Sequence, residues 1–201
     1  MQYSMDALET YFDRLPQFLK EHGKDVEKYV RIMVERIRQL QRKGLFLQWD
    51  LPGYDHAGFL GRYHDIGKSA IVDELWLSPA VFSDEERKLA RLHTVLGAGM
   101  VKEKLCVCAL KSSPDIGDVM ASCCLYHHER WDGTGYPFQL KGEEIPLYAR
   151  IIAVADAYDA MIEDRPYKKK LTVEEALEEI RREAGKQFDP DLAEIFVSLN
   201  L

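Results

Sequence analysis

The sequence lacks a long hydrophobic run. No stretch approaches the roughly 18 apolar residues of a membrane helix. The opening segment MQYSMDALETYFDRLPQF mixes acidic residues among the apolar ones instead of placing a hydrophobic block after a basic one. These absences argue against a membrane-spanning segment and a secretory leader. We therefore expect a cytoplasmic protein that does not act at a membrane.

Cysteines are few, and the sequence has no excess of positive charge. The cysteines form one C-x-C and one C-C pair, which is not the spacing of a zinc ribbon, so we expect reduced and mostly buried thiols at Cys106, Cys108, Cys123 and Cys124. The formal net charge is −7 at pH 7, which argues against binding to a nucleic-acid polymer. An anionic ligand would need a local basic cluster.

Alternating strand patterns and internal repeats are absent, and helical signals dominate. With 201 residues, of which 46% are hydrophobic, the chain suffices for one core and is short for two. We predict an all-α fold in a single domain over residues 1–201, with a motif-bearing core at about 20–200 and no separate sensor or receiver domain. The segments 45–60 and 132–145 contain glycine and proline and are predicted loops.

Helix beginnings can be read at four places. Ser83–Glu86 and Thr172–Glu175 have the form of a capping box, and the first predicts one helix through RKLARLHTVLGAGMVKEKL. Pro146 and the pair Asp189–Pro190 begin two more helices. In DVEKYVRIMVERIRQLQRKG, apolar residues at helical spacing predict a buried face made of Val26, Val30, Met33 and Ile37.

Histidines beside acidic residues are the first candidates for chemistry. His64 is followed directly by Asp65, and His93, His127 and His128 stand in or near predicted helices. A single histidine in a helix is more often a surface residue or a hydrogen-bonded core residue than a ligand. Imidazole and carboxylate together suit iron, manganese or zinc and leave positions for water, so the combination favours a metal.

Asp156 strengthens this interpretation. It lies in ARIIAVADAYDAMI, which is apolar nearly all round and is therefore predicted to be a buried helix. A buried carboxylate is costly unless it is paired or coordinates a cation. A metal shared with His64 and Asp65 is one possible partner, and a salt bridge to a neighbour such as Arg150 is the alternative.

The order of these motifs resembles the HD-GYP family, which comprises bacterial phosphodiesterases of the HD superfamily that hydrolyse cyclic di-GMP. The resemblance extends from about His22 to Pro190. It depends on H-D-I-G-K at 64–68, His93, H-H-E-R-W-D-G-T-G-Y-P at 127–137, I-P-x-x-A-R-I at 145–151, A-D-A-Y-D-A at 155–160 and R-P-Y-K at 165–168. It implies an HD-superfamily helical bundle with a G-Y-P loop beside a metal centre.

The resemblance also implies a ligand set. In the family the matching positions bind two or three divalent metals, usually iron or manganese. In this sequence those positions are His22, His64, Asp65, His93, His127, His128 and Asp156, of which His22 is the loosest match. Members with three metals carry a glutamate where this chain has Phe18. A phenyl ring cannot ligate, so two metals are expected.

Asp65 and Lys68 are the residues implied in catalysis. Asp65 would bridge the metals, which would hold and activate a water as nucleophile, and Lys68 would face the phosphate and offset its developing charge. For substrate binding the resemblance implies Arg165 and Lys168, with Tyr136 beside the pocket. Glu129 would support an imidazole as a hydrogen-bond acceptor.

The leading interpretation is a metal-dependent phosphodiesterase. It would open cyclic di-GMP to the linear dinucleotide, with GMP as a further product, through a hydroxide that bridges the metals. Two alternatives stay open: a cyclic-dinucleotide receptor with negligible turnover, and another HD-superfamily activity such as a nucleotide phosphohydrolase or a di-iron oxygenase. A signalling protein that contacts the G-Y-P loop and a homodimer are further expectations.

We predict that Arg165→Ala mainly raises the KM for cyclic di-GMP. The guanidinium would hold a phosphate in the bound substrate and in the transition state alike, so its loss should leave kcat nearly unchanged. A steady-state titration with cyclic di-GMP measures both constants. An unchanged KM would remove Arg165 from the pocket.

Overall fold

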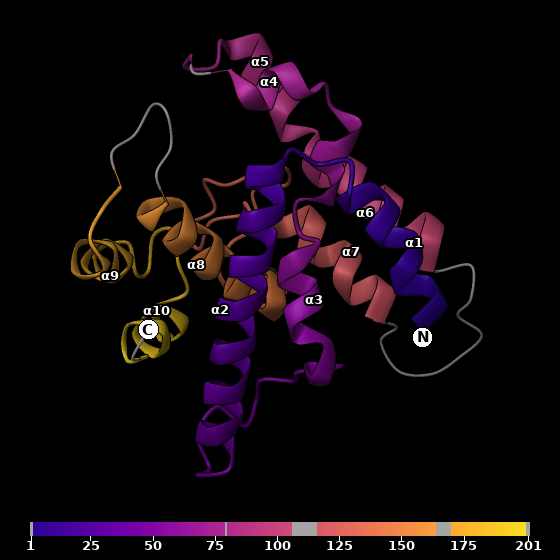
Figure 1. The fold of residues 1–201 in the computed structure, drawn as a ribbon. Helices are drawn as coiled ribbons and strands as arrows, with labels where there is room; N and C mark the ends of the chain where they lie inside the picture. The colour runs from indigo at the N-terminus through magenta and orange to yellow at the C-terminus, as the bar shows by residue number, and fades with distance from the viewer. Residues whose placement is uncertain (1, 79, 106–115, 164–169, 200–201) are drawn as a thin grey trace.

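The structure, a computed structural model, describes residues 2–78, 80–105, 116–163 and 170–199. Within these ranges every regular element is a helix, apart from one isolated bridge between Ala184 and Phe188. The α-helices are α1 (Gln2–Phe12), α2 (Gln17–Gln41), α3 (Ala57–Arg62), α4 (Asp73–Leu77), α5 (Asp84–Arg91), α6 (His93–Leu105), α7 (Ile116–Tyr126), α8 (Leu147–Ile162), α9 (Val173–Arg182) and α10 (Pro190–Val197). The 3-10 helices are η1 (Tyr54–His56), η2 (Ile66–Ala70) and η4 (Gly142–Glu144). The predicted all-α fold is confirmed (Figure 1).

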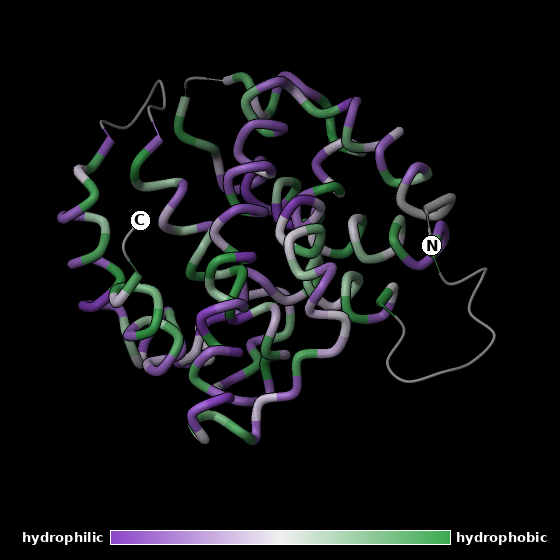
Figure 2. The backbone as a smooth tube through the Cα atoms, turned by 60° about the horizontal axis from the view of Figure 1, so that its bottom comes forward, coloured by the Kyte–Doolittle hydropathy of each residue, from purple (hydrophilic) through white to green (hydrophobic). Residues whose placement is uncertain are grey.

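Helix α2 runs through the middle of the fold, and α3 and α8 both pack against it (Figure 1). Its predicted apolar face is confirmed, because no part of that face is exposed at Val26, Val30, Met33 or Ile37. Hydrophobic and hydrophilic residues alternate along the helices, as an inward and an outward face require (Figure 2). Among the helices described, none has the length and apolar character needed to cross a bilayer.

The four predicted helix beginnings are confirmed. Both capping boxes, Ser83–Glu86 and Thr172–Glu175, form with reciprocal hydrogen bonds. Helix α8 starts directly after Pro146, and the Asp189 carboxylate accepts from backbone N–H groups in the first turn of α10. After α9, Gly185 adopts a φ of 78°, the left-handed conformation that glycine tolerates at such an end.

One predicted helix is divided in two. The segment after Ser83 forms α5 and α6, which are separated at Leu92. The His93 ring contacts the carbonyl of Ala90 through Nδ1 at 2.6 Å, and Thr94 Oγ1 donates to the carbonyl of Arg91 at 3.0 Å. Side chains that take carbonyls three residues back compete with backbone N–H groups, which accounts for the break.

Helix α3 contradicts the end of a predicted loop. Its first residues fall in the predicted loop 45–60, where glycines were interpreted as turn residues. A Cβ on Gly61 would lie 2.9 Å from the side chain of Val30 and 3.1 Å from the carbonyl of Val26. This glycine therefore permits close packing of α3 on α2. The second predicted loop, 132–145, is irregular apart from η4.

The two cysteines of α7 fit the prediction of buried, reduced thiols. Cys123 and Cys124 are free and fully buried, and burial raises the pKa of both. The thiols should therefore remain uncharged and unreactive at neutral pH. Cys106 and Cys108 lie outside the described residues.

A close approach between η2 and α6 positions two of the predicted metal ligands. A Cβ on Gly67 would lie 2.0 Å from the carbonyl oxygen of His93 and 2.4 Å from the backbone nitrogen of Gly97. Because backbone atoms cannot move aside like a flexible side chain, only glycine fits here. Gly67 thus allows the turn that carries Asp65 to lie directly against the start of α6, which carries His93.

We predict that Gly67→Ala destabilises the metal-free protein by about 3 kcal/mol, the upper range for overpacking, and weakens metal binding because η2 must move away from α6. Gly99→Ala is the matched control, since a Cβ there meets nothing within 4 Å. In a helix interior this control should gain about 1 kcal/mol. Urea unfolding followed by circular dichroism measures both. Equal stability of the two variants would contradict the close-approach argument.

Candidate metal centre

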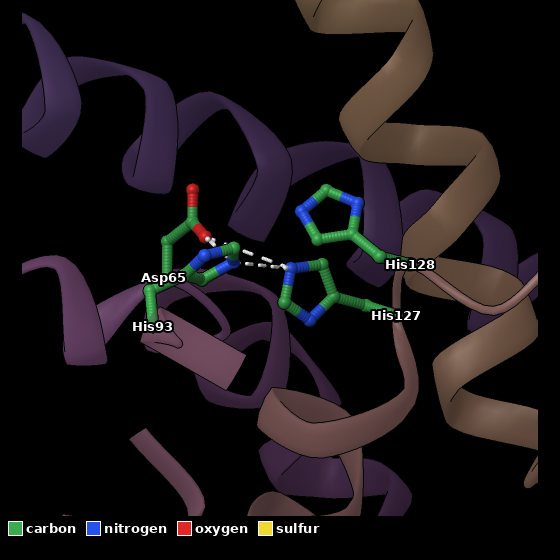
Figure 3. Close-up of side chains that lie close together, drawn as sticks. All are labelled: Asp65, His93, His127 and His128. Atoms are coloured by element: carbon green, nitrogen blue, oxygen red, sulfur yellow. Dashed lines mark hydrogen bonds and ion pairs between the residues drawn. The ribbon is translucent and has the colours of Figure 1, made fainter. Parts of the chain in front are cut away.

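Five segments of the chain meet at one buried place. The seven predicted ligands come from α2 (His22), the turn between α3 and η2 (His64 and Asp65), the start of α6 (His93), the residues after α7 (His127 and His128) and α8 (Asp156). They fall into two groups whose ligand atoms lie within 4.8 Å of one another. One group contains Asp65, His93, His127 and His128 (Figure 3), and the other contains His22, His64 and Asp156.

The two oxygens of Asp65 face different sets of imidazoles. Oδ1 lies 3.1 Å from Nε2 of His93 and 3.6 Å from Nε2 of His127. Oδ2 lies 3.3 Å from Nε2 of His64 and 3.9 Å from Nε2 of His22. One carboxylate is therefore placed between two clusters of nitrogen atoms, as a bridging ligand would be.

The backbone sets the orientation of three of these rings. Nδ1 lies 2.6 Å from the Gly61 carbonyl oxygen in His64, and 2.6 Å from the Ala90 oxygen in His93. In His127 it lies 3.0 Å from the carbonyl oxygens of both Cys123 and Cys124. A carbonyl only accepts, so Nδ1 must carry the proton in each ring. The Nε2 lone pair is then directed toward Asp65, which is the tautomer that binds a metal.

Asp156 forms no salt bridge with Arg150, the neighbour named as the alternative partner. Arg150 instead pairs with Asp189 through a contact of 2.6 Å between Nη1 and Oδ2. Oδ1 of Asp156 lies 3.1 Å from Nε2 of His22, whose Nδ1 lies 2.6 Å from Oδ2 of Asp159. His22 therefore lies between two carboxylates.

Asp159 is a site residue that the sequence analysis overlooked. It follows Asp156 by one helical turn in the A-D-A-Y-D-A motif, which was its only signal. Together with His22 and Glu163 it forms a third cluster of potential ligands. Its 2.6 Å contact with Nδ1 makes it an orienting partner of the imidazole, which leaves Nε2 for the Asp156 side.

The charges in the centre are strongly coupled. Burial alone would raise the pKa of Asp65, but Lys68 and His64 outweigh it and hold this pKa well below its usual range. Burial likewise opposes ionisation of Asp156, yet His22 and His64 lower its pKa. Burial would lower the pKa of His22, but Asp156 and Asp159 raise it to about 9. Both carboxylates are thus ionised at neutral pH.

The donor set fits divalent metal ions. Nε2 of His64 and Oδ1 of Asp65 are buried and have no hydrogen-bond partner among the described residues. Unsatisfied buried polar atoms of this kind are costly. Imidazole nitrogens and carboxylate oxygens together suit iron, manganese or zinc, so bound cations would satisfy these atoms.

Residues 15–192 match the family model described as HD domain. The chain belongs to the HD domain family. A cyclic di-GMP phosphodiesterase of Thermotoga maritima is 40% identical over 141 residues, which cover 70% of this chain and 36% of the relative. A cyclic di-GMP phosphodiesterase of Pseudomonas aeruginosa is 43% identical over 146 residues, covering 73% of this chain and 33% of the relative. These relatives support the predicted HD-GYP membership.

A solved structure has the same fold as this HD domain. It is a cyclic GMP-AMP specific phosphodiesterase of V. cholerae, aligned with a TM-score of 0.57 at 24% identity over 94% of this chain and 46% of that chain. A 3'3'-cGAMP-specific phosphodiesterase of Vibrio cholerae is 34% identical over 134 residues, or 67% of this chain and 24% of the relative. The HD domain described here spans about a third of the length of the curated relatives it matches.

The G-Y-P loop of the HD domain lies directly beside the ligand groups. The ring of Tyr136 stacks on His128 with a centroid distance of 4.8 Å. A Cβ on Gly135 would lie 2.4 Å from the backbone nitrogen of Arg130, so the loop returns too closely for any other residue. The prediction for Glu129 is wrong: its buried carboxylate accepts backbone N–H groups of Phe138 and Leu140, at 2.7 and 3.1 Å, and so anchors the loop.

The basic residues predicted around the site have different outcomes. The Lys68 ammonium contacts Oδ2 of Asp65, beside the centre as expected. Arg165 and Lys168 lie outside the described residues, so their substrate-binding role stays a prediction. Arg91, which the sequence analysis did not select, lies over the Tyr136 ring with its guanidinium carbon 4.8 Å from the ring centroid. Its only sequence signal was its position two residues before His93.

We predict that the wild-type HD domain binds two divalent metals and that each ligand group can be emptied separately. His93→Ala should lose about one metal per chain, and His22→Ala should lose about one from the other group, because each variant removes a nitrogen donor from a different cluster. Metal content by mass spectrometry after manganese loading measures this.

His56→Ala is the control for these variants, since His56 is the one histidine that belongs to neither group. It should retain the wild-type metal content. Full metal content in both ligand variants would contradict the assignment, and loss of all metal in each would contradict two separable groups.

Proposed function

We propose that this HD domain is a metal-dependent phosphodiesterase that opens cyclic di-GMP to the linear dinucleotide. The observation that carries the proposal is Asp65, whose two oxygens face two different groups of imidazole nitrogens. Such a centre suits phosphodiester hydrolysis because it would hold two cations beside one substrate group. Bound metals would polarise the phosphate and supply a nucleophilic water at neutral pH.

The residues of the chain have distinct roles in this reaction. His93, His127 and His128 would hold one cation, while His22, His64 and Asp156 would hold the other, and Asp65 would contact both. Because the rings are oriented by backbone carbonyls, little rearrangement is needed when the ions bind. The centre is therefore preorganised.

Lys68 would offset charge that develops on the phosphate. Its ammonium contacts Asp65 and lies 5.4 Å from the ring centroid of Trp76. Trp76 also donates from Nε1 to the Lys68 carbonyl at 3.2 Å, which fixes the backbone that carries the lysine. A cation held at this place stabilises the transition state without having to be reoriented.

The substrate class rests on the relatives and on the G-Y-P loop. Relatives at 40% and 43% identity are named cyclic di-GMP phosphodiesterases, and others are named for 3'3'-cGAMP. We infer a cyclic dinucleotide, with cyclic di-GMP as the first choice. Iron or manganese is the expected metal, in keeping with the mixed nitrogen and oxygen donors.

The test of this proposal is turnover by metal-loaded protein. Protein purified without oxygen and loaded with ferrous iron or manganese should convert cyclic di-GMP to the linear dinucleotide, as followed by chromatography. Asp65→Ala should lose all turnover and His56→Ala should keep it, because only the first removes the shared ligand. Binding without loss of substrate would favour the receptor alternative, and neither binding nor loss would favour another HD-superfamily reaction.

A further inference from the structure

A pocket of about 250 Å³ lies beside the two ligand groups. One part of its wall contains His127 and His128, and Tyr136 of the G-Y-P loop forms another. Two arginines, Arg91 and Arg130, also line it. The two differ in whether their guanidinium group is already paired with other groups of the protein.

The guanidinium of Arg130 is paired with groups in its own loop and in the segment after α9. Nη1 donates to Oε1 of Gln187 at 2.8 Å, and Nε donates to Oγ1 of Thr134 at 3.1 Å. Nη2 lies 3.4 Å from Oε2 of Glu183, which offsets the positive charge. Arg130 thus connects the G-Y-P loop to the segment after α9 and is a structural residue.

Arg91 is available to a ligand. Its side chain is exposed at the end of α5, and its guanidinium carbon lies 4.8 Å from the centroid of the Tyr136 ring. In the described part of the chain, no carboxylate forms an ion pair with Arg91. Because Tyr136 in turn stacks on His128, the cation is held beside the ligand groups without being neutralised.

A cyclic dinucleotide carries two phosphodiesters on opposite sides of one macrocycle. Only one can be at the metal centre during a reaction, so the other needs a separate cation. Arg91 lines the pocket and cannot itself ligate a metal, so its guanidinium stays available beside the ligand groups. Arginine is well suited to this task because its planar fork can donate to two phosphate oxygens at once.

We propose that Arg91 binds the second, non-reacting phosphate of the cyclic dinucleotide. This inference rests on the proposed function and adds a residue that determines which substrates bind. A simple phosphodiester, which lacks the second phosphate, gains nothing from Arg91. The residue therefore favours cyclic dinucleotides over other phosphodiesters that could reach the same metals.

The experiment compares two substrates in manganese-loaded wild type and Arg91→Ala. Cyclic di-GMP has both phosphates, whereas the para-nitrophenyl ester of GMP has the guanine base and only the reacting phosphate. The variant should raise the KM for cyclic di-GMP about tenfold or more, as for the loss of hydrogen bonds to a charged group. Its kcat should change little, and both constants for the GMP ester should stay at wild-type values.

Two further variants control for charge and for geometry. Arg87→Ala removes an arginine from the same helix, where it pairs with Asp84 at 3.1 Å and lies away from the pocket lining, so its KM should match wild type. Arg91→Lys keeps the charge but loses the planar fork, so its KM should lie between those of wild type and Arg91→Ala. Circular dichroism and metal content should be equal in all four proteins.

The outcomes separate this inference from the proposed function. If wild type hydrolyses cyclic di-GMP and Arg91→Ala has the same KM, only the role of Arg91 is overturned. A raised KM for both substrates also overturns it, since Arg91 would then contact the base or the reacting phosphate. If wild type binds cyclic di-GMP without turnover, a tenfold higher dissociation constant in Arg91→Ala supports the inference. If wild type neither hydrolyses nor binds cyclic di-GMP, both proposals are overturned.

Discussion

The buried carboxylate of Asp65 is the constraint on which the arrangement of this HD domain depends. Its residue is only 4% exposed, and a buried charge without partners costs several kcal/mol. The Lys68 ammonium contacts one oxygen of this carboxylate, and imidazoles from three other segments lie near its two oxygens. Helices α2 and α6, together with the end of α7, must therefore meet at the turn between α3 and η2.

Glycines and backbone carbonyls allow these segments to meet. Gly61 and Gly67 remove the Cβ atoms that would hold α3 away from α2 and η2 away from α6. Three of the imidazoles are oriented by carbonyls three or four residues earlier in their own segment. His64, His93 and His127 are thus oriented within their own segments, whereas His22 is oriented by Asp159 of helix α8. The centre can form without metal, at the cost of unsatisfied atoms that metal would satisfy.

Local signals predicted much of the fold, because caps and apolar faces are properties of short segments. Ser83, Thr172 and Asp189 each begin a helix for reasons visible within four residues. The first residues of helix α3 were interpreted as a loop because Gly58 looks the same whether it serves a turn or a close contact. The difference lies in its neighbours Glu27 and Arg31, which belong to a distant segment.

The candidate site was predictable only through the order of its motifs. Spacing alone cannot bring His22 and Asp156 together, and the resemblance supplied that pairing. Asp159 was overlooked because two aspartates one turn apart share a helix face, and only the contact with Nδ1 of His22 separates their roles. Glu129 was misassigned because a neighbour in sequence need not be a neighbour in space.

Under the proposed function, the two buried carboxylates make metal loading favour substrate binding. Asp65 and Asp156 repel a phosphodiester, and the ammonium of Lys68 is paired with Asp65. Bound divalent cations would offset these two carboxylates and so add to the attraction proposed for Arg91.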